Sequence, residues 1–192
     1  MKRQEPGTWI RAGIITVLVL GAFSVNRSAA QSASAAGRGQ GRGAAPAFQA
    51  EATLGQLMKG VFFPASNVIF AAQGQNPADV TPAKDPSAAT DPLQNAYGKW
   101  EAVENGALAI AEGANLLMIP GRKCSNGKPV PMGNANWAVF VQGVREAGLK
   151  AYKAAQSKDQ DKILEAADTL TTACGNCHDK YREKPTLADR CM

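Results

Sequence analysis

The sequence contains few of the residues from which proton-transferring active sites are usually built. Its 192 residues include one histidine, His178, and four cysteines, and aromatic residues make up only 6% of the chain. An enzyme that moves protons during its reaction needs positioned acid–base groups, and histidine is the most common of these. A single histidine gives little support for an enzymatic function, and we expect that this protein is not an enzyme.

Signals for β-strands and for a membrane-spanning helix are also missing. No segment shows the alternation of apolar and polar residues that is typical of a strand, and no βαβ pattern is visible. The longest apolar run, residues 12–25, is too short to span a bilayer comfortably. No cysteine follows this run, so a lipoprotein anchor is not supported.

Residues 1–30 are typical of a secretory signal peptide. Basic residues flank the apolar run, and the small residues Ser28 and Ala30 stand where a cleavage site requires them. We expect cleavage before Gln31, with a second site a few residues later, and export to the periplasm. If the segment is not cleaved, it would serve instead as a membrane anchor.

The charge balance does not indicate nucleic-acid binding. The chain has a formal net charge of +5. Residues 1–30 contain four basic residues and one acidic residue, so the chain without them keeps a charge of only +2. No stretch interleaves aromatic with basic residues, and we expect no nucleic-acid partner.

Beyond the signal segment, the chain divides into a linker and a helical domain. Residues 31–49 are rich in Ala, Gly and Ser and lack apolar periodicity, which is typical of a flexible linker. Apolar residues then recur at alternating spacings of three and four, which predicts helices over about 50–73, 92–118, 135–156 and 158–183. This pattern favours an all-α fold, a four-helix bundle over residues 50–185, followed by a tail at 186–192.

Two prolines bear on where these helices begin. Asp91 is a good N-cap and Pro92 fits the first helical position, which predicts the start of the second helix. Pro64 lies inside the first predicted helix, where it removes a hydrogen bond and clashes with the preceding turn. We expect this helix either to kink near Gly60–Pro64 or to begin later.

The most informative stretch is Cys174-Gly175-Asn176-Cys177-His178, a C-x-x-C-H motif. This spacing is the signature of covalent c-type haem attachment. Two thiols one helical turn apart can each form a thioether with one porphyrin, and the adjacent imidazole is then held where it can coordinate the iron. Because His178 is the only histidine, it is the only candidate for that imidazole.

Other interpretations of the motif are weaker. A dithiol redox pair usually accompanies a βαβ pattern, which this chain lacks. A structural zinc site usually needs four Cys or His ligands. Cys124 and Cys191 could complete a four-cysteine set, but they lack the second short C-x-x-C spacing that is typical of such sites. As an alternative, two spare cysteines in an exported chain usually form a disulfide. We predict a Cys124–Cys191 bond that pins the tail to the loop after the second helix; two free thiols or an intermolecular bond are the alternatives.

The position of the motif on its helix points to a buried cofactor. Both motif cysteines fall on the apolar stripe of the fourth predicted helix, together with Ile163, Ala167, Leu170 and Tyr181. A group attached there would lie in the interior of the bundle.

A late C-x-x-C-H followed by Tyr181-Arg182, on the last helix of a bundle, resembles the class II c-type cytochromes, which comprise cytochrome c prime and the low-spin cytochrome c-556 type. The resemblance covers about residues 50–185. It implies one haem c, bonded to Cys174 and Cys177 through two thioethers, with His178 as the proximal ligand and Arg182 near the haem edge or a propionate. Class I cytochromes c usually carry the motif near the N-terminus.

Within this family the sixth ligand separates electron carriers from gas-binding proteins. The stretch Leu57-Met58-Lys59 resembles the low-spin members, in which a methionine of the first helix coordinates the iron. Met58 as ligand implies a periplasmic one-electron carrier. If the alignment slips by a turn, an apolar residue such as Val61 or Phe62 faces the iron, and NO or CO would bind at a vacant distal site.

The remaining methionines and the partners are less well indicated. Met118, Met132 and Met192 are weaker candidates for the sixth ligand than Met58. Homodimers are common in the family that the chain resembles, so a homodimer is one possible assembly. An electron carrier also needs redox partner proteins, which the sequence does not identify.

Overall fold

The computed structural model describes residues 48–192, and the signal peptide and nearly all of the linker expected from the sequence lie outside them. Within the described part, the regular structure is helical apart from one isolated bridge between Lys123 and Pro129. This confirms an all-α fold for residues 48–192.

The first helical segment is continuous but changes its winding twice. It comprises α1 (Leu54–Leu57), the π-helical turn η1 (Met58–Phe62) and α2 (Phe63–Gly74). Thr53 and Gln56 form a capping box at its start, in which each side chain accepts a hydrogen bond from the other's backbone N–H. The predicted helix over 50–73 is confirmed, with its start at residue 54.

The π turn is the structure's response to Pro64. A proline cannot donate to the carbonyl four residues before it, and its ring clashes with that carbonyl in an α-helix. Here the wider turn comes immediately before the proline, and the Phe63 N–H donates to the carbonyl of Met58, five residues back. The helix therefore does not begin after Pro64; the deformation is absorbed in Met58–Phe62.

The second predicted helix begins later than its capping signals indicate. Asp91 does cap a turn, accepting from the N–H of Leu93 at 2.9 Å, but that turn is the short 3-10 element η4 (Pro92–Gln94). The helix α3 (Lys99–Leu116) starts only after Gly98, and the φ of 59° at Lys99 prevents a continuous helix from η4 into α3. The expected start at residue 92 is therefore wrong. Two similar 3-10 turns, η2 (Pro77–Asp79) and η3 (Pro86–Ala88), fill the loop before η4.

The last two helices form a hairpin that matches the sequence periodicity closely. The helix α4 (Ala135–Ser157) ends at Lys158, which adopts a left-handed conformation. The helix α5 (Gln160–Tyr181) starts at once, with the Asp159 carboxylate accepting from the N–H groups of Asp161 and Lys162. The predictions over 135–156 and 158–183 are both confirmed. A 3-10 turn, η5 (Leu187–Asp189), lies in the segment after α5.

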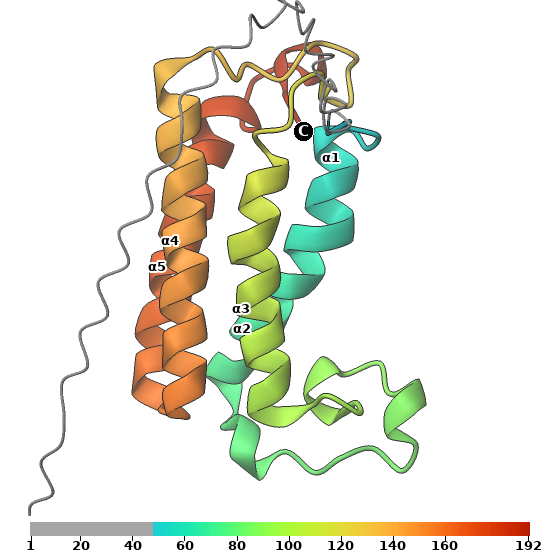
Figure 1. The fold of residues 1–192 in the computed structure, drawn as a ribbon, viewed down its shortest axis with the longest axis vertical. Coiled ribbons are helices and arrows are strands. Elements are labelled where there is room, and N and C mark those ends of the chain that lie inside the picture. Colours follow the sequence, from blue (N-terminus) through green and yellow to red (C-terminus); the bar gives the residue numbers. More distant parts are fainter. Residues whose placement is uncertain (1–47) are drawn as a thin grey trace, which may run out of the picture. The chain divides into compact units, whose positions relative to one another are not determined.

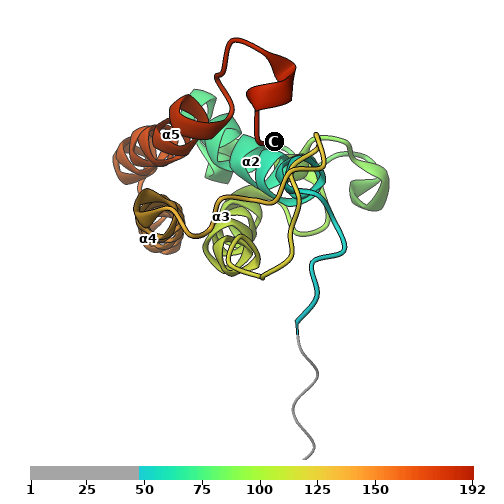
Figure 2. The same ribbon diagram turned by 90° about the horizontal axis from the view of Figure 1, so that it is seen from above.

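The helices form an antiparallel four-helix bundle. In chain order α2 packs on α3, α3 on α4, α4 on α5, and α5 returns to α2, which closes the ring (Figure 2). Successive helices run in opposite directions, and the loop after α3 and the segment after α5 lie at the same end as α1 (Figure 1). No helix within residues 48–192 combines the length and apolar character needed to cross a membrane.

The end of the bundle near α1 is held by polar and covalent links. The guanidinium of the buried Arg122 donates to the carbonyls of Leu116 and Ala52, at 2.9 and 2.6 Å, and so joins the end of α3 to the approach to α1. A disulfide joins Cys124 to Cys191, which confirms the predicted pairing.

A close crossing of α3 and α4 depends on Gly148. A Cβ at this position would lie 2.8 Å from the backbone nitrogen of Ala111 and 3.1 Å from the carbonyl oxygen of Ala107. A side chain there would press on backbone atoms that cannot move away. Gly143, on the same helix, has open space around the position of a Cβ.

We predict that Gly148→Ala lowers the free energy of unfolding by about 1–3 kcal/mol, because the two helix backbones must separate. Gly143→Ala is the matched control, and it should leave stability unchanged or raise it by up to about 1 kcal/mol through helix propensity. Urea unfolding of both variants measures the difference. Equal effects of the two substitutions would contradict the close crossing.

Candidate functional site

The C-x-x-C-H motif occupies the last turns of α5. Cys177 and His178 follow Cys174 by three and four residues, so the three side chains share one side of the helix. All three are half-buried, and both cysteines are free of disulfide bonds. The apolar stripe expected on this helix is present, since Ile163, Ala167, Leu170 and Tyr181 are buried.

A cavity of about 740 Å³ opens between the first helical segment and α5. Its volume lies within the roughly 300–1,000 Å³ that is typical of small-molecule and cofactor sites. The lining is largely apolar: α3 and α4 contribute Ile110, Phe140, Val141 and Val144, and α2 contributes Phe63 and Phe70.

The five residues that the sequence singled out all line this one cavity. They come from three places in the chain: the π turn, the end of α5 and the residue that caps α5. The residues are Met58, Cys174, Cys177, His178 and Arg182.

Met58 and His178 lie within about one helical turn of the same height in the bundle. The side chain of Gln160 donates to the carbonyl of Ala72 at 2.5 Å, which fixes the register of α5 against α2. From that point His178 lies about 27 Å along α5 and Met58 about 21 Å back along the first segment, at about 1.5 Å per residue. Side chains on a helix lean toward its N-terminus, so in this antiparallel pair His178 leans down and Met58 leans up, toward each other.

The residues that follow Met58 have different surroundings. Val61 and Phe62 both approach Gly113 of α3: a Cβ at Gly113 would lie 3.3 Å from Val61 Cγ1 and 3.4 Å from Phe62 Cζ. Phe62 is buried and reaches the cavity from that side, whereas Val61 is not part of the lining. Met58 is therefore the residue of the π turn that brings a metal-ligating atom to the cavity.

Two cations border the cavity. The Arg182 guanidinium donates to the carboxylate of Glu183 at 2.5 Å, and its side chain is 45% exposed. Lys59 is exposed and also lines the cavity. The sequence pointed only to Arg182, although Lys59 directly follows Met58, and this adjacency was the signal that could have identified it.

The surroundings of the motif cysteines disfavour thiolates. Burial raises the pKa of Cys174, although the charge of Arg182 acts in the opposite direction. Burial, followed by the neighbouring Cys174, raises the pKa of Cys177 to about 11. Catalytic dithiols need a lowered pKa and often lie at a helix N-terminus. These thiols lie near a helix C-terminus, so a thiol–disulfide exchange site is not favoured.

The surroundings of the His178 imidazole favour its neutral form. Burial lowers its pKa, the charge of Arg182 lowers it further, and Glu183 and Asp179 oppose both effects. The backbone carbonyl of His178 accepts from the N–H groups of Arg182 and Glu183, at 2.7 and 2.9 Å, which closes the last turn of α5. A neutral imidazole retains a nitrogen lone pair, as a metal ligand requires.

A four-cysteine zinc site is ruled out by the disulfide. Cys124 and Cys191 are bonded to each other, so they cannot serve as thiolate ligands beside the motif. In the part of the chain that the structure describes, no group of three or more His, Cys, Asp or Glu side chains is arranged to hold a metal ion.

The structure distinguishes Met192 from the other two methionines that the sequence ranked below Met58. Met118 and Met132 do not line the cavity, whereas Met192 does. Its contribution depends on a contact between the tail and the first helical segment, which no local pattern indicates.

Comparisons with protein-family models, with curated proteins and with solved structures found no match to this chain.

We predict that the Cys177 thiol of the haem-free chain is alkylated slowly at neutral pH, with a rate that rises to a midpoint near pH 11. The sign follows from burial, which favours the uncharged thiol, so the thiolate forms only at higher pH. Iodoacetamide labelling followed by peptide mass spectrometry measures the rate. The same chain in urea is the control and should titrate near the ordinary thiol pKa of about 8.5. A midpoint that is the same in both conditions would show that the thiol is not shielded.

Proposed function

We propose that this chain is a c-type haem protein of the class II cytochrome kind, which carries one electron at a time in the periplasm. The observation that carries the proposal is the common cavity: the C-x-x-C-H residues of α5 and the thioether residue Met58 of η1 line the same space. His178 serves as the proximal ligand and Met58 as the sixth ligand.

The residues of the cavity fit a haem c. They include two thiols at the spacing for two thioethers, one neutral imidazole, one thioether and a largely apolar wall. Lys59 and Arg182 supply positive charge for the two propionates. When bound, the haem supplies an iron that alternates between the ferrous and ferric states.

The chain's own residues hold and shield this group. Cys174 and Cys177 would hold it on one side of α5, and His178 and Met58 would reach it from α5 and η1. The aromatic and branched side chains that line the cavity, among them Phe70, Phe140 and Val144, would exclude water from around it. A site fixed on packed helices changes little between two oxidation states, which suits electron transfer.

The lining also supports a carrier over an enzyme. None of the described residues that border the cavity is an aspartate or a glutamate, and the one histidine is assigned to the proximal side. A haem enzyme that cleaves or reduces a bound substrate needs a proton-transferring group on the distal side. The residues that line the cavity elsewhere are apolar, amide, hydroxyl or cationic.

We predict that the exported protein contains one haem that remains attached after denaturation and extraction. Cys174→Ser and Cys177→Ser should each leave a single thioether, and the double variant should lose covalent haem completely. Intact mass spectrometry measures attachment. The control is Cys124→Ser with Cys191→Ser, which removes the other two cysteines and should retain the haem. If haem is absent from the exported wild-type chain, the proposed function is wrong.

We predict that Met58→Ala abolishes the methionine–iron charge-transfer band of the ferric protein, makes the iron high-spin and lowers the reduction potential, since thioether ligation raises it. Met118→Ala is the matched control, because this methionine is 42% exposed and does not line the cavity. Absorption spectra and potentiometric titration measure both effects. A wild-type protein that is already high-spin and binds CO or NO would instead identify a gas-binding protein.

A further inference from the structure

Met192 brings the segment after α5 to the wall of the cavity. It lines the cavity together with Gly55 of α1 and Met58 of η1. A Cβ at Gly55 would lie 2.8 Å from the backbone carbonyl carbon of Met192 and would also clash with Ser125 Oγ. The backbone of Met192 therefore packs where any other residue at position 55 would place its side chain.

Short-range tethers hold Met192 at this position. Cys191 is bonded to Cys124 through the disulfide, and its N–H donates to the carbonyl of Tyr181 at 2.8 Å. The Ser125 N–H donates to the carbonyl oxygen of Met192 at 2.5 Å. Met192 is thus fixed from both the 117–134 loop and the end of α5.

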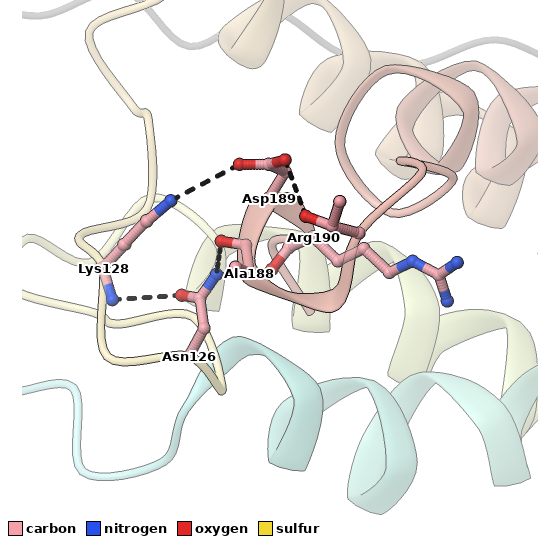
Figure 3. A network of polar contacts seen from close by, with 6 residues as sticks. Asn126, Lys128, Ala188, Asp189 and Arg190 are labelled. Atoms are coloured by element: carbon pink, nitrogen blue, oxygen red, sulfur yellow. Dashed lines mark hydrogen bonds and ion pairs between the residues drawn. The ribbon is translucent and has the colours of Figure 1, made fainter.

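A second set of contacts holds the rest of the segment. The side-chain amide of Asn126 donates to the carbonyls of Ala188 and Arg190, at 2.9 and 2.8 Å, while its own oxygen accepts from the N–H of Lys128 (Figure 3). The Lys128 ammonium lies 3.7 Å from the carboxylate of Asp189. The Asn126 side chain thus satisfies two backbone carbonyls of the segment after α5, which fixes the position of that segment against the loop.

The position of Met192 bears directly on Met58. Gly55 precedes Met58 by three residues, so the two are neighbours on one side of the helix. The side chain of Met58 leans toward the N-terminus of its helix, that is, toward the turn on which Met192 packs. Because Gly55 has no side chain, the backbone of Met192 packs against this turn, and Met192 lines the cavity beside Gly55 and Met58.

We propose that residues 183–192, which we call the tail segment, form the wall of the cavity on the Met58 side, and that Met192 is a positioning residue for Met58. The tail segment limits the space into which the Met58 side chain can swing and through which a small external ligand can enter. The inference rests on the proposed function for its effect on the haem. The closing of the cavity by the tail segment is a property of the chain itself.

Two variants separate this role from general stability. Met192→Ala shortens the side chain of a cavity-lining residue and leaves every tether in place, because the tethers involve Cys191 and the backbone of Met192. Leu187→Ala is the matched control, because this residue belongs to the same segment, is 69% exposed and does not line the cavity. The variant with Cys124→Ser and Cys191→Ser releases the tail segment, and thermal unfolding checks that each variant is folded.

The first measurement is the rate of CO binding to the ferrous holoprotein. We expect Met192→Ala and the double serine variant to bind CO about tenfold faster than the wild type. This corresponds to an activation free energy for CO binding that is lower by about 1.4 kcal/mol. Leu187→Ala should bind at the wild-type rate. Rates that are the same in all four proteins would overturn the role of Met192.

The second measurement does not depend on haem. In the haem-free full chain, Cys174 and Cys177 line the cavity as free thiols, and iodoacetamide must enter to reach them. We expect faster alkylation in Met192→Ala and in the double serine variant, but not in Leu187→Ala. Unchanged alkylation would overturn the wall even if haem attaches normally. Faster alkylation in a chain that never binds haem would keep the wall and refute the proposed function.

Discussion

The antiparallel contact between α2 and α5 is the interaction on which the site depends. At one end the side chain of Gln160 donates to the carbonyl of Ala72, and small residues of the two helices, Ala72, Ala166 and Ala167, are fully buried. Farther along, η1 takes the place of α2, and the last turns of α5, from Thr171 to His178, line the cavity. The same close packing that stabilises one end of the bundle therefore aligns the two sides of the cavity at the other end.

The π turn decides which residues of the first segment reach that cavity. In an uninterrupted α-helix, Met58 and Val61 would continue the buried stripe of Ala65, Val68 and Ala72. The wider turn inserts an extra residue and rotates the residues before it relative to those after it. As a result Phe62 is buried and Met58 is only half-buried at the cavity. Pro64 thus determines the orientation of a residue six positions earlier.

This explains how much of the molecule the sequence could predict. The helices α4 and α5 have uninterrupted periodicity and local caps, and their predicted ranges are correct to within two residues. The start of α3 was misplaced because the capping signal at Asp91 is genuine but serves a 3-10 turn. Asn95 then accepts from the N–H of Tyr97, which competes with helix formation until Gly98.

The candidate site divides in the same way. The motif on α5 is local, so spacing alone placed Cys174, Cys177 and His178 on one face. Met58 was selected as part of the inward stripe, yet it lies at the cavity because the π turn removed it from that stripe. The proximity of Met192 to Gly55 could not be predicted, because it requires a disulfide, two loops and a glycine far apart in the sequence to meet.

The electrostatics of the cavity give the proposed carrier a direction. The lining is largely apolar, and such surroundings disfavour the more highly charged ferric state. A thioether as the sixth ligand also raises the potential. Lys59 and Arg182 add positive charge at the edge of the cavity, although Glu183 offsets the charge of Arg182 through their ion pair. The apolar lining, the thioether and the charge of Lys59 favour the reduced form, and the Arg182–Glu183 pair adds little, so we expect the proposed carrier to have a raised reduction potential. We expect Glu183 to weaken this preference for the reduced form, because its carboxylate pairs with Arg182 at the edge of the cavity.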